Sequence, residues 1–218
     1  MYINKVRSVR VLFFILACSS FVSCFKDLTV VNDVYKNDFN AGNLTNLELS
    51  GWSNAGFGPL SDKRISSFTG ETLLGKFNNN LVRLTLSNLP VHQVMRVELD
   101  LYIHNSWKND IWRISFDNNN MLLTGFSNDT AIRQSYPNWY GNAALLSPAG
   151  ANAQNTDLPG TCSLVTRSRA SSMYHIVISA THSNSSFILE CNDAGGVAND
   201  TCTRSWSMDN LKITTLKN

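Results

Sequence analysis

The sequence predicts an all-β protein in which two antiparallel sheets pack face to face as a β-sandwich. Apolar and polar residues alternate with a period of two over several segments, and turn-rich breaks separate these segments at short spacing. No window shows sustained helical periodicity. A length of 218 residues suits one domain of this class.

The clearest alternation covers residues 94–103, where Met95, Val97 and Leu99 share one face and the polar residues between them share the other. Further strands are expected at residues 81–86, 111–116, 121–123, 175–180, 187–191 and 205–214. Polar residues at 117–120 and 181–186 predict two hairpin connections. Residues 128–161 hold three prolines and several glycines, so a long excursion over the surface is expected there.

The first 23 residues have the layout of a secretory signal peptide. Residues 1–10 carry three cations and no acid, residues 11–17 are continuously apolar, and small residues follow. This apolar run is far shorter than the roughly 20 residues that cross a bilayer. A buried N-terminal strand, the alternative, fits poorly with three cations ahead of it, so we expect an exported protein.

The position of the signal cleavage site decides whether the mature protein is lipid-anchored or released. Residues 21–24, FVSC, resemble a bacterial lipobox, in which Cys24 would be lipidated and would become the mature N-terminus. Cleavage after Cys24 by ordinary signal peptidase is the rival and would release the protein. We expect cell-surface or extracellular localisation, with membrane attachment only through Cys24. Residues 24–36 would then form a tether or a first edge strand, and residues 37–218 the sandwich domain.

The charge balance argues against nucleic-acid binding. Without the three cations of the leader, 15 basic residues stand against 16 acidic ones, so the mature chain is nearly neutral. A nucleic-acid-binding domain is expected to show a basic excess.

The cysteines outside the leader are candidates for a disulfide, because export places them in an oxidising compartment. Cys191 and Cys202 flank a loop rich in Gly, Asn and Asp, and we favour a bridge between them. Pairing of Cys162 with either of them is the alternative. A zinc site is not expected, because no C-x-x-C pair occurs and the four histidines are scattered.

Several short phrases occur together in a characteristic order. They are FN at 39–40, LSGW at 49–52, LGKFN at 74–78, LSNLPVH at 86–92, LDLYIHNSW at 99–107, QSYP at 134–137 and SWSMDNLKI at 205–213. In this order they resemble a family of secreted bacterial jelly-roll domains, and the last phrase resembles the closing strand of lectin-like and carbohydrate-binding jelly rolls. The resemblance spans about residues 37–214 and implies a two-sheet jelly roll.

The resemblance also implies a structural calcium ion. Asp209 matches the last-strand Asp that shares calcium in such domains, and Asn40 stands where a first-strand Glu is usual. The alternative for Asp209 is a strand-end carboxylate bonded to neighbouring backbone N–H groups. In the phrase D-S-W-D-G, Asn105 and Lys108 replace both acids, and the Lys108 ammonium opposes cation binding there.

Four aromatic residues are candidates for ligand binding. Tyr136, Trp139 and Tyr140 lie in the long Pro- and Gly-rich loop, and Trp107 flanks a shorter one. Exposed aromatic faces can stack on sugar rings. Alternatively, the three loop residues pack together as the small core that a large loop needs, and Trp107, like Trp112, is a rim or core residue. We expect Trp52 and Trp206 in the core.

Catalysis is not expected. Glu98 and Asp100 form an E-x-D pair on one strand face, but the third acid of the sandwich-glycosidase pattern is absent. No H-E-x-x-H, G-x-S-x-G, P-loop or dinucleotide-binding pattern occurs.

The sequence therefore predicts an exported, non-catalytic adhesion or carbohydrate-binding module whose partner is a glycan or a surface protein. The alternative is a structural subunit of an envelope or extracellular assembly that binds protein partners. A divergent glycoside-active enzyme is the third hypothesis.

Overall fold

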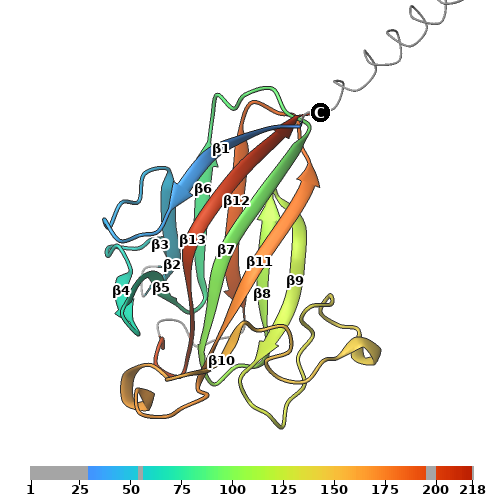
Figure 1. The fold of residues 1–218 in the computed structure, drawn as a ribbon. Helices are drawn as coiled ribbons and strands as arrows, with labels where there is room; N and C mark the ends of the chain where they lie inside the picture. The colour runs from blue at the N-terminus through green and yellow to red at the C-terminus, as the bar shows by residue number, and fades with distance from the viewer. Residues whose placement is uncertain (1–28, 54–55, 195–199, 218) are drawn as a thin grey trace, which may run out of the picture.

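The computed structural model describes residues 29–53, 56–194 and 200–217 (Figure 1). Within these residues the chain forms two antiparallel sheets that face each other, as the alternation predicted. No helix in this part of the chain is long and apolar enough to cross a membrane. The predicted leader and Cys24 lie outside the described residues.

The strand order of the two sheets is that of a jelly roll. The first sheet runs β10(Asn155–Leu158), β11(Ser171–Thr181), β7(Val94–Asn105), β13(Arg204–Lys217), β5(Glu71–Phe77) and β4(Ile65–Phe68), and β1(Val30–Asn37) also pairs with β13. The second runs β3(Gly56–Pro59), β2(Leu47–Ser53), β6(Asn80–Leu86), β12(Phe187–Ala194), β8(Lys108–Phe116) and β9(Asn119–Ser127). Because the chain from β6 to β13 repeatedly crosses between the sheets, residues far apart in sequence meet at each end of the sandwich.

The core lies between the sheets and follows the predicted alternation. The inward residues of β7, including Val97, Leu99 and Leu101, are buried, and Val82 and Leu84 of β6 are buried on the facing sheet. A one-residue slip would turn these side chains outward, so the apolar pattern fixes the register of both strands.

Trp206 and Trp112 are fully buried in this core and lie edge to face, with ring centroids 6.0 Å apart. The prediction that Trp52 is a core residue is wrong. Leu49 and Gly51 occupy the inward positions of β2, so the alternation turns Trp52 outward. There it packs edge-on against Phe57 of β3, with the ring centroids 5.6 Å apart, and both rings stay half exposed.

A second, smaller core covers part of the outer face of the first sheet. The hairpin formed by β4 and β5 brings Phe68 and Leu73 against Tyr102 of β7. His104 packs edge to face with Phe68, with ring centroids 4.6 Å apart, and its two ring nitrogens lie within 3.1 Å of the Ser171 and Ser207 hydroxyls. Burial lowers the pKa of His104 to about 3, so this histidine is neutral.

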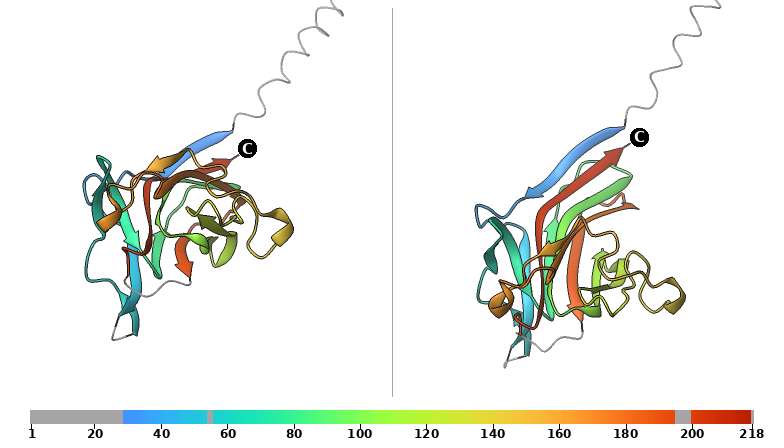
Figure 2. Two further views of the ribbon diagram at one scale, coloured as in Figure 1. Left: turned by 90° about the horizontal axis from the view of Figure 1, so that it is seen from below. Right: turned by 60° about the horizontal axis from the view of Figure 1, so that its bottom comes forward.

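The two ends of the sandwich differ. The start of β1 and the C-terminus lie at one end, and the long connections lie at the other, where β7 leads into β8 and β9 into the loop before β10 (Figure 1). The loop between β9 and β10, coloured yellow to gold, projects from one side of the sandwich (Figure 2). This confirms the predicted surface excursion, which contains the short 3-10 helix η2(Ala143–Leu145).

Candidate functional site

A cavity of about 380 Å³ lies at the end of the sandwich away from the C-terminus. Three segments line it: the turn from β7 into β8, the residues after β9, and the segment between the 3-10 helix η3(Cys162–Leu164) and β11. Its amide and charged side chains are those of Asn105, Lys108, Asn128, Asp129, Arg167 and Arg169. Pockets of this size commonly hold small ligands.

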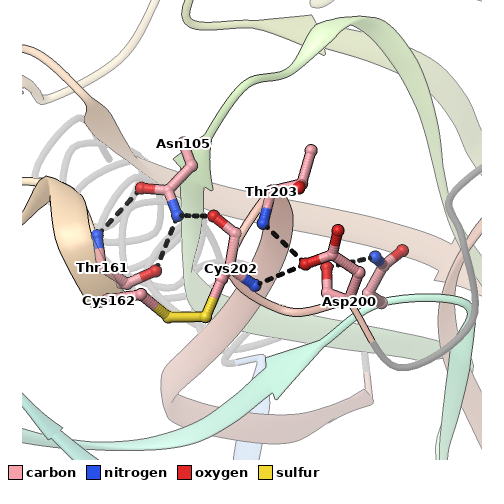
Figure 3. Close-up of a disulfide and its surroundings, with 7 residues drawn as sticks. Asn105, Thr161, Cys162, Asp200, Cys202 and Thr203 are labelled. Atoms are coloured by element: carbon pink, nitrogen blue, oxygen red, sulfur yellow. Dashed lines mark hydrogen bonds between the residues drawn. A yellow bond between two sulfur atoms is a disulfide. The ribbon is translucent and has the colours of Figure 1, made fainter.

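A disulfide holds one wall of this region, and it is not the bridge that the sequence favoured. Cys162 pairs with Cys202, with 5.6 Å between their Cα atoms (Figure 3). Cys191 is a free, buried thiol on the inward face of β12, so it faces the core rather than Cys202. Burial raises the pKa of the Cys191 thiol. The expected Cys191–Cys202 bridge is therefore wrong, and the alternative pairing through Cys162 is confirmed.

Asn105 joins both sides of the disulfide to the end of β7 (Figure 3). Its Nδ2 donates to the Thr161 hydroxyl at 2.8 Å and to the Cys202 carbonyl at 2.7 Å, and its Oδ1 accepts from the Thr161 N–H at 2.9 Å. Its φ of 64° lies in the left-handed region, which Asn adopts more readily than most residues. These bonds fix the cavity wall and leave little of this amide for a ligand.

Asn128 also lines the cavity and is held in the same way. Its Nδ2 lies within 3.2 Å of the carbonyl oxygens of Ile103, Asn105 and Ala170. Its Oδ1 accepts from the Ser172 hydroxyl at 2.7 Å. A side chain with its amide so engaged holds the surrounding backbone in place.

The charged side chains around the cavity are predominantly basic. Lys108, Arg167 and Arg169 are exposed, and no ion pair within the described residues includes any of them. Asp129 is the only carboxylate among the lining residues, and its Oδ1 accepts from the Ala131 N–H at 3.0 Å. The cavity lining thus carries two more positive than negative charges.

The loop aromatics lie outside this cavity. Tyr136 is partly buried against Phe126 of β9 and Tyr174 of β11, with ring centroids 4.8 and 5.3 Å away. It therefore packs on the core of the sandwich and not in a separate core of the loop. Trp139 and Tyr140 are 50% and 42% exposed. The Tyr140 N–H donates to the Leu123 carbonyl at 2.8 Å, which docks this segment on the free edge of β9.

Trp107 is not available to a ligand. Its ring is fully buried, and its Nε1 donates to the Ser205 carbonyl at 2.9 Å. The Arg204 guanidinium covers the ring at 4.8 Å from its centroid. The prediction of Trp107 as a ligand-binding residue is wrong, because the turn from β7 into β8 directs this indole into the core.

Asp209 lies beside Asp100, where the register between β13 and β7 shifts. Burial raises the pKa of Asp209 to about 6; the Asn210 N–H opposes this shift, and nearby carboxylates, with Asp100 first, add to it. Asn40 is exposed, and its backbone N–H donates to Asp38 at 3.2 Å.

The described residues contain no group of three or more His, Cys, Asp or Glu side chains placed to hold a metal ion. Calcium takes six to eight oxygen ligands. Asp209 and Asn40 alone do not supply that set, so backbone carbonyls or water would have to complete it. A calcium site at these residues stays a prediction.

The E-x-D pair lies on the outer face of the first sheet, away from the cavity. The Asp100 carboxylate lies 2.8 Å from Nδ1 of His175, and Glu98 forms an ion pair with Arg96 at 3.0 Å. Both acids are thus engaged in a surface network on β7 and β11.

The sequence did not point to Arg167, Arg169 or Asn128. The two arginines, which lie two positions apart after Cys162, can be seen in the sequence as a small basic cluster. Their proximity to Lys108 cannot be seen there, because it depends on the strand order and on the disulfide.

Comparisons with known proteins show a distant similarity of fold. No family model matches the chain, and no curated protein matches it. A family 35 carbohydrate-binding module from Clostridium thermocellum aligns with 86% of this chain and 98% of its own, at 10% identity and a TM-score of 0.36. Dimeric latent PorU from Porphyromonas gingivalis aligns at 10% identity and a TM-score of 0.39, over 79% of this chain and 13% of that one. An exo-β-1,3-galactanase from Phanerochaete chrysosporium aligns at 10% identity and a TM-score of 0.33, over 86% and 29% of the two chains.

Proposed function

We propose that this protein is an exported, non-catalytic adhesion or carbohydrate-binding module that holds its glycan in the cavity at the disulfide end. The observation that carries this proposal is a preformed cavity of about 380 Å³ whose lining offers hydroxyl groups and cations, and whose backbone is held by the side-chain amides of Asn105 and Asn128. Saccharide hydroxyls need closely placed donors and acceptors, whereas an apolar ligand would leave these groups unpaired.

The number of carboxylates in the cavity lining supports glycan binding without hydrolysis. Glycoside hydrolysis in most families uses two carboxylates on either side of the scissile bond. The cavity lining provides one, Asp129.

The disulfide supports an oxidising compartment outside the cytosol. If Cys24 is lipidated, the six residues from Cys24 to β1 span at most about 20 Å, which keeps the domain near the membrane. The segments that line the cavity lie at the end of the sandwich where β7 leads into β8, opposite the C-terminus and the start of β1 (Figure 1). This arrangement would present the cavity outward, as adhesion requires.

A pair of tryptophan substitutions tests the binding site. Ser168 lies on the cavity rim, so Ser168→Trp should obstruct the cavity without changing its charge. Ser183→Trp places the same side chain on an exposed loop between β11 and β12 and is the matched control. On a glycan array, wild-type protein and the control should bind the same glycans, and Ser168→Trp should lose about tenfold or more in affinity. Equal binding by both variants, or no glycan binding by the wild type, would contradict the proposal.

The structural calcium is proposed at Asp209, supported by its carboxylate neighbours, Asp100 first among them. Thermal unfolding with millimolar Ca²⁺ and with EDTA tests it. Calcium should raise the Tm of the wild type and leave Asp209→Asn unchanged, because binding to the folded state alone stabilises it. An equal response of the two proteins rules out this site.

The second candidate function is a structural subunit that binds a protein partner. It is favoured by the half-exposed Trp52 and Phe57 on the hairpin of β2 and β3, at an edge of the second sheet. Exposed aromatic residues at a sheet edge are typical of protein contacts. Chemical cross-linking on whole cells should then give a higher-mass species that Trp52→Ser/Phe57→Ser abolishes; an unchanged pattern would count against this function.

A further inference from the structure

We propose that the cavity selects glycans that carry carboxylate or sulfate groups over neutral glycans. This inference rests on the proposed function and names the ligand class of the same site. Lys108, Arg167 and Arg169 all line the cavity, against one carboxylate, Asp129. A cavity with an excess of one charge concentrates ligands of the opposite charge.

The three cations lack the partners that a nearby arginine has. Arg204, also at this end of the sandwich, is buried between Asp110 and Asp193, at 2.8 and 2.9 Å. Lys108, Arg167 and Arg169 form no comparable pair within the described residues. Their charges are therefore available to a ligand.

The backbone that carries these cations is held in place before any ligand arrives. The Arg167 N–H donates to the Leu164 carbonyl at 3.0 Å, and the Arg167 carbonyl accepts from the Gly160 N–H at 3.3 Å. The Asn105 N–H donates to the Ala170 carbonyl at 2.7 Å, which ties the segment to β7. The disulfide at Cys162 fixes the start of the same segment. Such pre-organisation lowers the entropy that binding must overcome.

The side chains also match the chemistry of an acidic sugar. Guanidinium groups form paired hydrogen bonds to carboxylate and sulfate oxygens, which favours Arg167 and Arg169 as the acid-binding residues. The hydroxyls of Ser106, Thr130 and Ser168 line the same cavity and can serve the sugar hydroxyls.

Matched polysaccharides test the selection. Polygalacturonate is compared with its methyl-esterified form, and dextran sulfate with dextran, by calorimetry at low and at physiological salt. The full mature chain should bind the charged member of at least one pair about tenfold more tightly, with an affinity that falls as salt rises. The pair that shows the preference identifies the acidic group as carboxylate or sulfate.

Charge-matched variants localise the effect. Arg167→Ala/Arg169→Ala should weaken binding of the acidic polymer about tenfold or more, because charge-assisted hydrogen bonds are lost. Lys36→Ala/Lys217→Ala removes the same charge from exposed positions on β1 and β13 and should leave the affinity unchanged. Equal losses in the two double variants would show non-specific attraction and would overturn the inference.

The remaining outcomes separate the two proposals. Equal binding of charged and neutral polymers refutes the charge selection and leaves carbohydrate binding intact. Inorganic sulfate serves as a small probe: amide NMR shifts at 167–169 without binding of any polysaccharide would support an anion site and refute the proposed function. No response to any polymer or to sulfate refutes both.

Discussion

Asp193 accepts hydrogen bonds from two other parts of the chain at the disulfide end. Its carboxylate receives the Trp206 indole N–H at 2.7 Å, the Arg204 guanidinium at 2.9 Å and the Asn79 backbone N–H at 3.0 Å. The Asp193 side chain is fully buried. It therefore joins the end of β12 to the start of β13 and to the turn before β6.

Asp193→Asn should lower the free energy of unfolding by about 3–5 kcal/mol, because Arg204 would lose the buried one of its two carboxylate partners. Urea unfolding measures this change. The control is Asp62→Asn, which removes the exposed partner of Arg64 and should cost less than about 1 kcal/mol. Similar losses in the two variants would show that the Asp193 network contributes no more than a surface pair.

Asp209 gives a prediction with a defined pH window. Its pKa is about 6 in the folded protein and 3.8 in the unfolded chain, so the folded state binds more protons between these values. The stability contributed by this group therefore falls as pH rises from about 4 to 6 and stays low above that. In EDTA, Asp209→Asn should be more stable than the wild type at pH 8 by about 1–3 kcal/mol. The difference should vanish near pH 3.5; a constant difference across this range would contradict the shift.

The burial of single residues was predicted correctly from the sequence in some cases and wrongly in others. Trp206 was placed in the core correctly, because it lies on an inward position of a long strand. Trp52 was misplaced, although Leu49 and Gly51 already define the inward positions of β2. Hydrophobicity suggested burial there, but the period of the strand decides which way a side chain points.

At the scale of elements, the disulfide closes a connection of 40 residues between Cys162 and Cys202. Removing it as Cys162→Ala/Cys202→Ala should lower the free energy of unfolding by roughly 3–4 kcal/mol, chiefly by freeing the unfolded chain. Denaturation under non-reducing conditions measures the loss.

Cys191→Ala is the control for this experiment. It should keep the wild-type protein's sensitivity to reducing agents, because Cys191 takes no part in the bridge. If the stability of Cys191→Ala no longer changed with reductant, the result would contradict the Cys162–Cys202 bridge and support the Cys191–Cys202 pairing that the sequence favoured.

Strands with long alternation were predicted well, and short ones were not. The pattern identified β6, β7, β8, β11, β12 and β13, and three residues, 121–123, of β9. The strands from β2 to β5 were missed because they are only four to seven residues long, and β2, β3 and β4 are also rich in Gly or Ser, so each shows too little alternation. Their pairing is decided by neighbours across the sheet, which no local pattern contains.

At the scale of the whole molecule, the cavity arises from topology. Lys108 and Arg167 are 59 positions apart in sequence, and crossing strands bring them to one end of the sandwich. The sequence predicted the fold class, whereas the pairing of loops at that end requires the strand order. This is why the cavity could not be inferred from the sequence, and why the exposed loop aromatics were the natural candidates.

The most direct test of binding in this cavity is a map of backbone amide NMR shifts. The chain from Phe25 to Asn218, which contains every described residue, would be titrated with a galacturonate trisaccharide and with maltotriose. We predict that the shifts concentrate at residues 105–108, 128–130 and 164–170. Shifts confined to residues 136–140, or to the outer face of the first sheet around Asp100, would contradict binding in the cavity.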